Sequence, residues 1–260
     1  MDFWSSTGDD SFQASEKLVQ AVSFNKVGEV LSAIKEGANI NYLRLDISPI
    51  LTATMRGYNE CIDILLSHKA EDLPNGFGWT AFLEACIQKT PDILTQFLSH
   101  LDNYDEEARR SIMGAKDNKG IGAMASCMEH NRMDNAKLLF SVFPESITAT
   151  DNDGCNLALQ AVKQRNPEFL EWFLKKGVSP YQENSYVETA FSEATDAAWE
   201  EGLRLIRDFA PNSPSAVAGA LAKTRPEVQS GLSEQGQETV DDARDAPTSN
   251  PFGLGVKRKR

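Results

Sequence analysis

Basic residues are scarce relative to acidic ones in this sequence of 260 residues. There are 26 Lys and Arg against 38 Asp and Glu, a formal net charge of −12. A surface of that sign repels phosphate backbones, which argues against nucleic-acid binding by the bulk of the protein. No run approaches 18 apolar residues, so neither a membrane-spanning helix nor a membrane partner is expected. The opening residues, MDFWSSTGDD, are acidic where a secretion signal would be basic, so we expect a cytoplasmic protein.

Residues that perform chemistry are also few and scattered. The four Cys lie at least 25 residues apart without a CxxC pair, and the three His show no metal-ligand spacing. Nucleotide-binding and nucleophile motifs such as GxGxxG and GxSxG do not occur. DNDG from Asp151 looks like the start of a calcium loop, but Val162 stands where the loop needs an acid. We therefore predict no catalytic residue, no metal and no cofactor, and hence no enzyme.

The sequence does contain an internal repeat. Four of the five spacings between its six copies fall within two residues of 33. Each copy is a hexamer with a small or polar first residue and Ala or Cys at the sixth: EKLVQA from Glu16, SPILTA from Ser48, TAFLEA from Thr80, GAMASC from Gly122, NLALQA from Asn156 and TAFSEA from Thr189. A second helical pattern follows, as in VGEVLSAIKEG, where Gly37 would end the helix. The pattern predicts two short helices and a polar turn per unit, stacked as a solenoid.

This pattern resembles ankyrin repeats over residues 14–210. The resemblance rests on SPILTA from Ser48, DNDGCNLALQA from Asp151, IKEGANIN from Ile34 and ILLSHKA from Ile64. It implies an all-α ankyrin-repeat solenoid of about six helix-turn-helix units with β-turn fingers. The His that the family carries in its first helix is replaced throughout, by Val19, Leu51, Leu83, Ala125, Leu159 and Ser192. We therefore expect its hydrogen bonds between repeats to be missing.

Three segments depart from the repeat. Residues 1–13 form an N-terminal extension, and residues 101–113 are an insertion whose charges indicate an extended helix or a surface loop. The insertion is either a tolerated loop or a contact for a partner. Residues 211–260 hold five Pro, five Gly and one aromatic residue, which predicts a disordered tail. Since this tail carries 7 basic and 6 acidic residues, the preceding 210 residues hold 19 basic and 32 acidic ones.

The tail ends in a basic cluster beside a short apolar turn. The residues of this candidate motif are Phe252, Leu254, Lys257, Arg258, Lys259 and Arg260. Such a cluster is typical of a nuclear import signal, and it also suits a secretion signal in a pathogen, a docking peptide or an inert charged end. The sequence leaves these alternatives open.

The resemblance to ankyrin repeats implies that the turn tips and the first helices form a concave surface that binds a protein. Aromatic and Arg side chains dominate binding hot spots. The predicted partner-binding residues are Arg44, Leu45, Met55, Arg56, Phe77, Trp79, Gln88, Glu129, His130 and Tyr186. The alternative interpretation is that Trp79 and Leu45 fold onto neighbouring turns and only pack there.

We therefore predict a monomeric, non-enzymatic protein–protein interaction module, acting as an adaptor, an inhibitor or a sequestering protein. Its acidic repeats favour a partner with a basic surface. One alternative is an effector or regulator that KRKR directs to the nucleus or into a host cell. Another is an inhibitory or structural subunit whose tail inserts into its partner.

Overall fold

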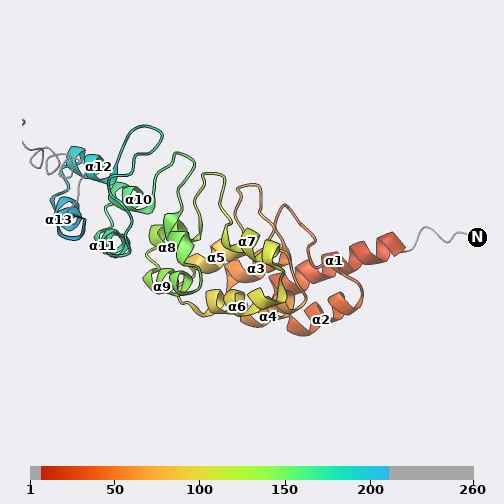
Figure 1. Cartoon of the computed structure of the whole chain (residues 1–260). Coiled ribbons are helices and arrows are strands. Elements are labelled where there is room, and N and C mark those ends of the chain that lie inside the picture. Colours follow the sequence, from red (N-terminus) through yellow and green to blue (C-terminus); the bar gives the residue numbers. More distant parts are fainter. Residues whose placement is uncertain (1–6, 211–260) are drawn as a thin grey trace, which may run out of the picture. The chain divides into compact units, whose positions relative to one another are not determined.

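The computed structural model describes residues 7–210, which form pairs of antiparallel helices stacked one after another (Figure 1). The first helices of the six pairs are α1 (Thr7–Ser23), α3 (Pro49–Arg56), α5 (Ala81–Ile87), α8 (Ala123–Glu129), α10 (Leu157–Lys163) and α12 (Ala190–Asp196). Their second helices are α2 (Val27–Lys35), α4 (Asn59–Ser67), α6 (Asp92–His100), α9 (Met133–Val142), α11 (Pro167–Lys175) and α13 (Glu200–Phe209). The predicted all-α repeat fold is confirmed.

Outside the first pair, where Glu16 lies within α1, the first residue of the repeated hexamer starts the first helix of its pair. Ser48, Thr80, Asn156 and Thr189 each accept a hydrogen bond from the backbone N–H three residues on, at 3.2, 3.3, 2.9 and 3.0 Å. Such N-caps each stabilise a helix by about 1 kcal/mol. In the fourth pair Gly122 takes this place without a side-chain bond. The polar residue of the sequence repeat is therefore a helix-starting residue.

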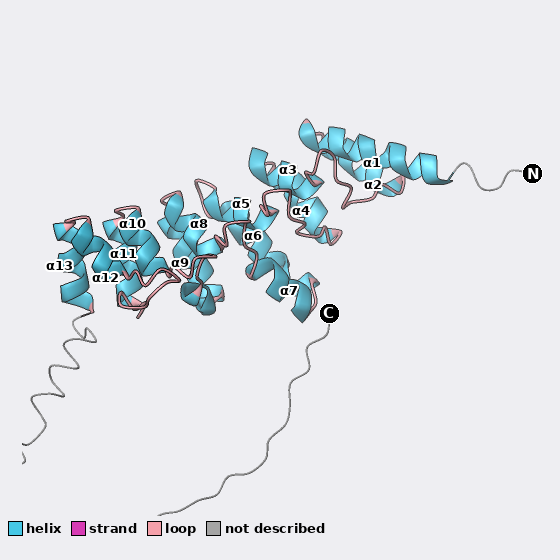
Figure 2. Cartoon of the chain, turned by 90° about the horizontal axis from the view of Figure 1, so that it is seen from above, coloured by secondary structure: helices cyan, strands magenta, loops and turns pink. Residues whose placement is uncertain are grey.

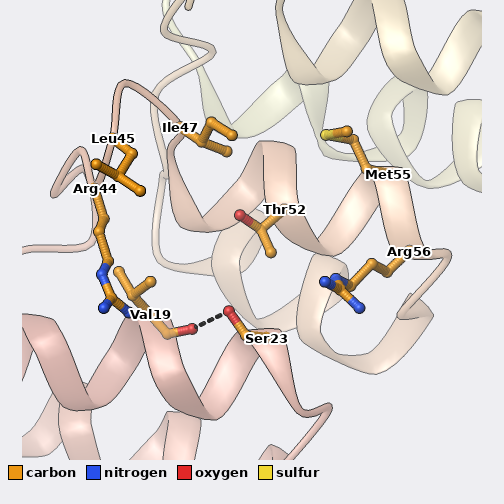
Figure 3. A pocket seen from close by; sticks show the side chains of 8 residues that line it. All are labelled: Val19, Ser23, Arg44, Leu45, Ile47, Thr52, Met55 and Arg56. Carbon is orange, nitrogen blue, oxygen red and sulfur yellow. Dashed lines mark hydrogen bonds between the residues drawn. The ribbon is translucent and has the colours of Figure 1, made fainter.

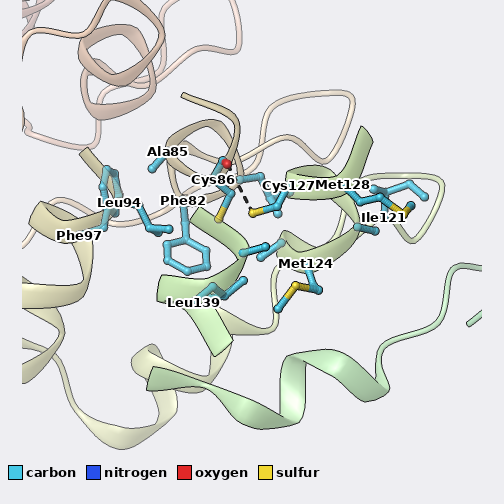
Figure 4. Packing of buried hydrophobic residues seen from close by; sticks show 14 of the residues in the cluster. Phe82, Ala85, Cys86, Leu94, Phe97, Ile121, Met124, Cys127, Met128 and Leu139 are labelled. Carbon is cyan, nitrogen blue, oxygen red and sulfur yellow. Dashed lines mark hydrogen bonds between the residues drawn. The ribbon is translucent and has the colours of Figure 1, made fainter. Parts of the chain in front are cut away.

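The sixth residue of the hexamer lets neighbouring pairs approach closely. Ala53, Ala85 and Ala161 are wholly buried where the first helices of adjacent pairs pack. Larger side chains fill the layers between the pairs, as Figure 4 shows for Phe82 and Met124. Burying a side chain of that size contributes about 1.5 to 3 kcal/mol. The positions of the missing family His are also apolar: Leu51, Leu83 and Leu159 are fully buried there.

The cysteines belong to this core. All four are free and buried. Cys127 of α8 donates from Sγ to the backbone carbonyl of Cys86 on α5 at 3.4 Å (Figure 4), and burial raises the pKa of the Cys86 thiol well above its usual value. These two thiols join neighbouring repeats as small apolar groups.

The loops that connect successive pairs extend as hairpins on one side of the helices (Figure 1). We number them finger 1 (residues 43–47), finger 2 (75–79), finger 3 (117–121), finger 4 (151–155) and finger 5 (184–188). Fingers 2 to 5 share one geometry: the N–H of the first residue donates to the carbonyl of the fifth at 3.0 to 3.2 Å. Each begins with Asn or Asp, whose Oδ1 accepts from the N–H groups of the third and fifth residues. The predicted β-turn fingers are therefore present.

Two segment predictions need correction. Helix α1 begins at Thr7, so part of the predicted N-terminal extension, residues 7–13, belongs to the first repeat helix. The insertion predicted at 101–113 is neither an extended helix nor a plain loop: after a 3-10 turn (Leu101–Asn103) comes a separate helix, α7 (Glu106–Met113), which Figure 2 shows beyond α6. A second 3-10 turn (Pro144–Thr148) follows α9.

The insertion is fixed to the stack by two side chains. The Tyr104 hydroxyl donates to the carbonyl of Ala70 at 2.7 Å, and Ile112 is buried in the core. Asp105 caps α7 by accepting from Ala108 N–H at 2.8 Å. The predicted disordered tail and its motif of Phe252, Leu254 and residues 257–260 lie outside the described residues. Of the helices between Thr7 and Phe209, none is long and apolar enough to cross a membrane.

Candidate partner-binding surface

Fingers 2 to 5 are joined into a ladder by backbone hydrogen bonds. Asn118 N–H donates to the carbonyl of Phe77 at 3.0 Å, Asn152 N–H to that of Lys119 at 3.1 Å, and Ser185 N–H to that of Asp153 at 2.8 Å. The side chain of Asn118 adds a bond to the carbonyl of Gly76, and that of Asn152 a bond to the carbonyl of Asn118. Each of these tips is therefore held by its neighbour.

Three of the four fingers in the ladder have glycine at the fourth position. Gly78, Gly120 and Gly154 have φ values of 76°, 82° and 80°, in the left-handed region. A Cβ at Gly120 would lie 2.5 Å from the backbone nitrogen of Asn152, so the next finger leaves no room for a side chain. Finger 5 differs: Val187 holds this position with φ 64°, a conformation that is costly for a β-branched residue.

Finger 1 is built differently. Arg44 and Ile47 exchange two backbone hydrogen bonds of 3.1 Å, which closes a turn with only Leu45 and Asp46 between them. These two residues have φ 50° and 66°. A two-residue turn with both central residues left-handed favours Asn-Gly, and Leu there costs about 1 to 2 kcal/mol. Between residues 7 and 210, no backbone hydrogen bond joins finger 1 to finger 2.

A cavity of about 400 Å³ opens beside this turn, between finger 1, α1 and α3 (Figure 3). Its walls are Val19 and Ser23 of α1, Arg44, Leu45 and Ile47 of finger 1, and Thr52, Met55 and Arg56 of α3. We call it the finger 1 pocket. The side chain of Leu45 is 91% exposed and that of Met55 54% exposed. Four of the ten predicted binding residues thus meet at one place: Arg44, Leu45, Met55 and Arg56.

The charged groups at this pocket are two guanidinium groups. Arg44 Nε lies 3.6 Å from Oε2 of Glu16, whose Oε1 accepts from the Tyr42 hydroxyl at 2.8 Å and so raises the pKa of that phenol. Arg56 has no ion pair within residues 7–210. The carboxylate of Asp46 lies against finger 2, where a Cβ on Gly76 would approach its Oδ2 to 2.8 Å.

Of the three predicted residues next to the pocket, one is exposed and two make contacts within the fold. Phe77, at the tip of finger 2, is 79% exposed. Trp79 packs on the core instead, and its Nε1–H donates to Oε2 of Glu84 at 2.9 Å. Gln88 is half-buried and joins α3 to α5, because its Nε2 donates to the carbonyl of Thr54 at 3.2 Å. The packing alternative therefore describes Trp79, while Leu45 stays exposed.

The remaining predicted residues lie further along the stack. Glu129 and His130 are at the end of α8, with His130 Nδ1 3.1 Å from the carbonyl of Ser126. The residue Glu129 is exposed overall, but partial desolvation of its carboxyl raises the pKa of this group. Tyr186 is 66% exposed on finger 5, and its hydroxyl lies 3.4 Å from Oδ1 of Asp153. The structure does not bring these three residues to the finger 1 pocket.

Sequence reasoning missed two residues of the finger 1 pocket and one exposed residue of finger 5. Val19 and Ser23 were absent from the predicted set because α1 reads as a polar end of the stack, whereas one of its faces lines the pocket. Val187, 69% exposed beside Tyr186, was also missed, although a β-branched residue where other fingers have Gly is a readable signal. No group of three or more His, Cys, Asp or Glu in residues 7–210 is arranged to hold a metal ion.

Comparisons with known proteins agree with this geometry. No protein-family model and no curated protein sequence matches the chain. Among solved structures, the ankyrin repeat protein EF0377 superposes with a TM-score of 0.65 at 18% identity, covering 75% of this chain and 98% of that one. The ankyrin repeat domain of Bcl-3, a member of the IkappaB family, gives 0.64 at 18% identity, with 75% and 85% covered.

A third similar structure is the complex of the predatory endopeptidase Bd0816 from Bdellovibrio bacteriovorus with immunity protein Bd3460. The matching chain gives a TM-score of 0.61 at 18% identity, with 75% of this chain and 98% of that chain covered. These similarities are at the level of the fold, which agrees with the repeat spacing and with the paired helices. Over about three quarters of its length, this chain has the ankyrin-repeat fold.

Proposed function

We propose that this chain is a non-enzymatic protein-binding module that takes its partner at fingers 1 and 2 and the adjacent end of α3. In this role it is an adaptor, an inhibitor or a sequestering protein. The proposal is supported by the exposure of Leu45, Met55 and Phe77 around the finger 1 pocket. Exposed apolar groups gathered at a concave site are typical of protein interaction surfaces.

The observation that carries the proposal is the state of Leu45. This residue combines an unfavourable left-handed backbone with a side chain that is almost wholly exposed, so it costs stability and gains no packing. Such strain is typical of functional positions, because folding alone gives no reason to keep it. A partner that covers Leu45 supplies that reason.

The neighbouring finger supports the same proposal in a second way. The carbonyl of Phe77 accepts the first bond of the finger ladder, and its N–H donates to Oδ1 of Asn75 at 2.9 Å. The backbone that presents this aromatic side chain is therefore held on both sides. A side chain presented by a fixed backbone loses less conformational freedom on binding, which increases affinity.

Site-specific photo-crosslinking in the native cell tests the proposal. A photoreactive residue at position 45 or 77 of the full chain is expected to capture one protein in high yield. The matched control is position 142, because Val142 on α9 is also an exposed apolar residue but lies on a second helix, away from the fingers. Capture of the same protein with equal yield from position 142 would contradict the proposed surface.

Substitutions then separate binding from folding. Replacing both Leu45 and Phe77 with Asp should abolish capture by a crosslinker placed at Met55, whereas Val142→Asp should leave it unchanged. All three side chains are exposed, so none of these variants should unfold at a lower temperature than the original protein. Undiminished capture by the double variant would remove fingers 1 and 2 from the binding surface.

A further inference from the structure

The finger 1 pocket differs in charge from the repeats that surround it. Residues 1–210 hold 32 acidic and 19 basic residues, yet among the residues that the structure describes no acidic side chain lines this pocket. Within the described part of the chain, its only charged lining residues are Arg44 and Arg56, on opposite sides of the opening in Figure 3. The local charge is therefore opposite to that of the whole stack.

The two guanidinium groups remain available to a ligand. Glu16 contacts Arg44 at Nε, which orients that side chain, and within residues 7–210 the two terminal nitrogens of Arg44 have no hydrogen-bond partner. Arg56, at the last turn of α3, has no ion pair in this range. Guanidinium groups bind carboxylates through paired hydrogen bonds, with stronger geometric selection than Lys.

The other polar groups of the wall offer no hydrogen atom to a ligand. Ser23 Oγ donates to the carbonyl of Val19 at 2.7 Å, as the dashed line in Figure 3 marks. Thr52 Oγ1 donates to the carbonyl of Ser48 at 3.1 Å. With both hydroxyl protons already engaged, the Arg side chains are the donors through which the wall can select a polar group.

The rest of the wall is apolar and adaptable. Val19 and Ile47 form its fixed part, since Val19 is buried and Ile47 packs against the core. Met55 and Leu45 form its exposed edges. A thioether side chain adjusts to partners of different shape, so this edge suits a bulky aliphatic or aromatic group rather than one fixed ligand.

We infer that the finger 1 pocket binds a segment of a partner protein in which a bulky apolar side chain stands beside Asp or Glu. The apolar side chain enters between Val19, Ile47 and Met55, while the carboxylate pairs with Arg44 or with Arg56 at the edge of the opening. This inference rests on the proposed function and names the partner motif of the same surface. It reverses the expectation from net charge, which favours a basic partner.

Selection from a library of random peptides on the immobilised full chain tests this inference. The probe is then the enriched peptide itself, labelled and titrated by fluorescence anisotropy. We expect enriched peptides with an apolar residue next to Asp or Glu, and weaker binding at higher salt because the ion pairs are exposed. Enrichment of basic peptides, or no enrichment at all, would overturn the inference.

Charge substitutions then locate the binding. Arg56→Gln should weaken binding of the enriched peptide by about tenfold, because it removes one charge-assisted contact. Arg56→Glu should weaken binding by more. Arg204→Glu on α13 is the matched control, since Arg204 is exposed and the change in net charge is the same. A peptide with its acids replaced by Lys should bind Arg56→Glu better than the unaltered protein.

The possible results separate this inference from the proposed function. Equal weakening by Arg56→Glu and Arg204→Glu would overturn the pocket assignment, because the effect would follow from net charge alone. Crosslinking from position 45 in cells does not depend on the peptide selection. If it still captures a partner while enriched peptides are basic, the protein-binding surface stands and the acidic motif is wrong.

Discussion

Finger 1 and fingers 2 to 5 occupy equivalent places in the repeat but are stabilised in different ways. Fingers 2 to 5 begin with Asn or Asp, and each donates to or accepts from its neighbour through the ladder. Finger 1 closes on itself, places Leu45 and Asp46 in left-handed conformations and borders the finger 1 pocket. The comparison separates the loops that stabilise one another from the loop that we propose as the binding site.

The largest expected effect is on the free energy of unfolding, for a substitution in the finger ladder. Gly120→Ala combines a left-handed backbone with a Cβ only 2.5 Å from Asn152 N, so we expect a loss of about 3 to 4 kcal/mol in the free energy of unfolding. Gly154→Ala is the control, because φ is nearly the same while the nearest atom is 3.5 Å away. Its loss should be about 1 kcal/mol in urea unfolding. Equal losses would show that the close approach of Asn152 to Gly120 does not affect stability.

The base of finger 2 should respond to pH through the carboxyl of Asp72. Burial raises the pKa of Asp72 from 3.8 to about 6, although its Oδ1 accepts Phe82 N–H at the start of α5. The folded state thus favours the protonated carboxyl. Stability from this group is full below about pH 4 and is lost as the pH rises through about 6, by about 2 to 3 kcal/mol.

The variant Asp72→Asn isolates this effect, since Asn keeps the acceptor oxygen and cannot titrate. The variant should unfold at higher urea than the original protein above pH 7, and the difference should disappear near pH 4. A difference that stays constant with pH would rule out Asp72 as the titrating group.

The smallest expected effect sharpens the comparison within the ladder. Val187 stands where fingers 2 to 4 have Gly, and its side chain is mostly exposed. Val187→Gly should therefore increase the free energy of unfolding by about 1 kcal/mol, because it removes backbone strain and little packing. A decrease in the unfolding midpoint would show that Val187 packs on a neighbouring finger instead.

The repeat architecture could be predicted from the sequence because its causes are local. The N-cap residues and the buried Ala residues recur at fixed positions, so the roles of Ser48 and Ala53 can be predicted from the sequence alone. The fingers could be located in the same way from their Asn, Asp and Gly residues. The separate helix α7 could not, since contacts of Tyr104 and Ile112 with distant parts of the stack hold it in place.

The finger 1 pocket could be predicted only in part, because three separate segments form it. Arg44 and Arg56 stand out as exposed candidates, but Val19 becomes a wall residue only once α1 lies against α3. Trp79 shows the reverse case. Its residue type suits a binding hot spot, but in the structure it packs against the core and donates a hydrogen bond to Glu84. Side-chain direction at a turn depends on tertiary neighbours, which no local pattern records.

The central claim is that the strained turn of finger 1 lowers the stability of the fold and presents Leu45 to a partner. Its most direct test is the paired measurement of unfolding and of partner capture for the double substitution Leu45→Asn with Asp46→Gly, which gives the turn the residues it favours. We predict an increase of about 1 to 2 kcal/mol in the free energy of unfolding together with loss of capture by a crosslinker at position 55. Lower stability, or full capture by the stabilised variant, would contradict the claim.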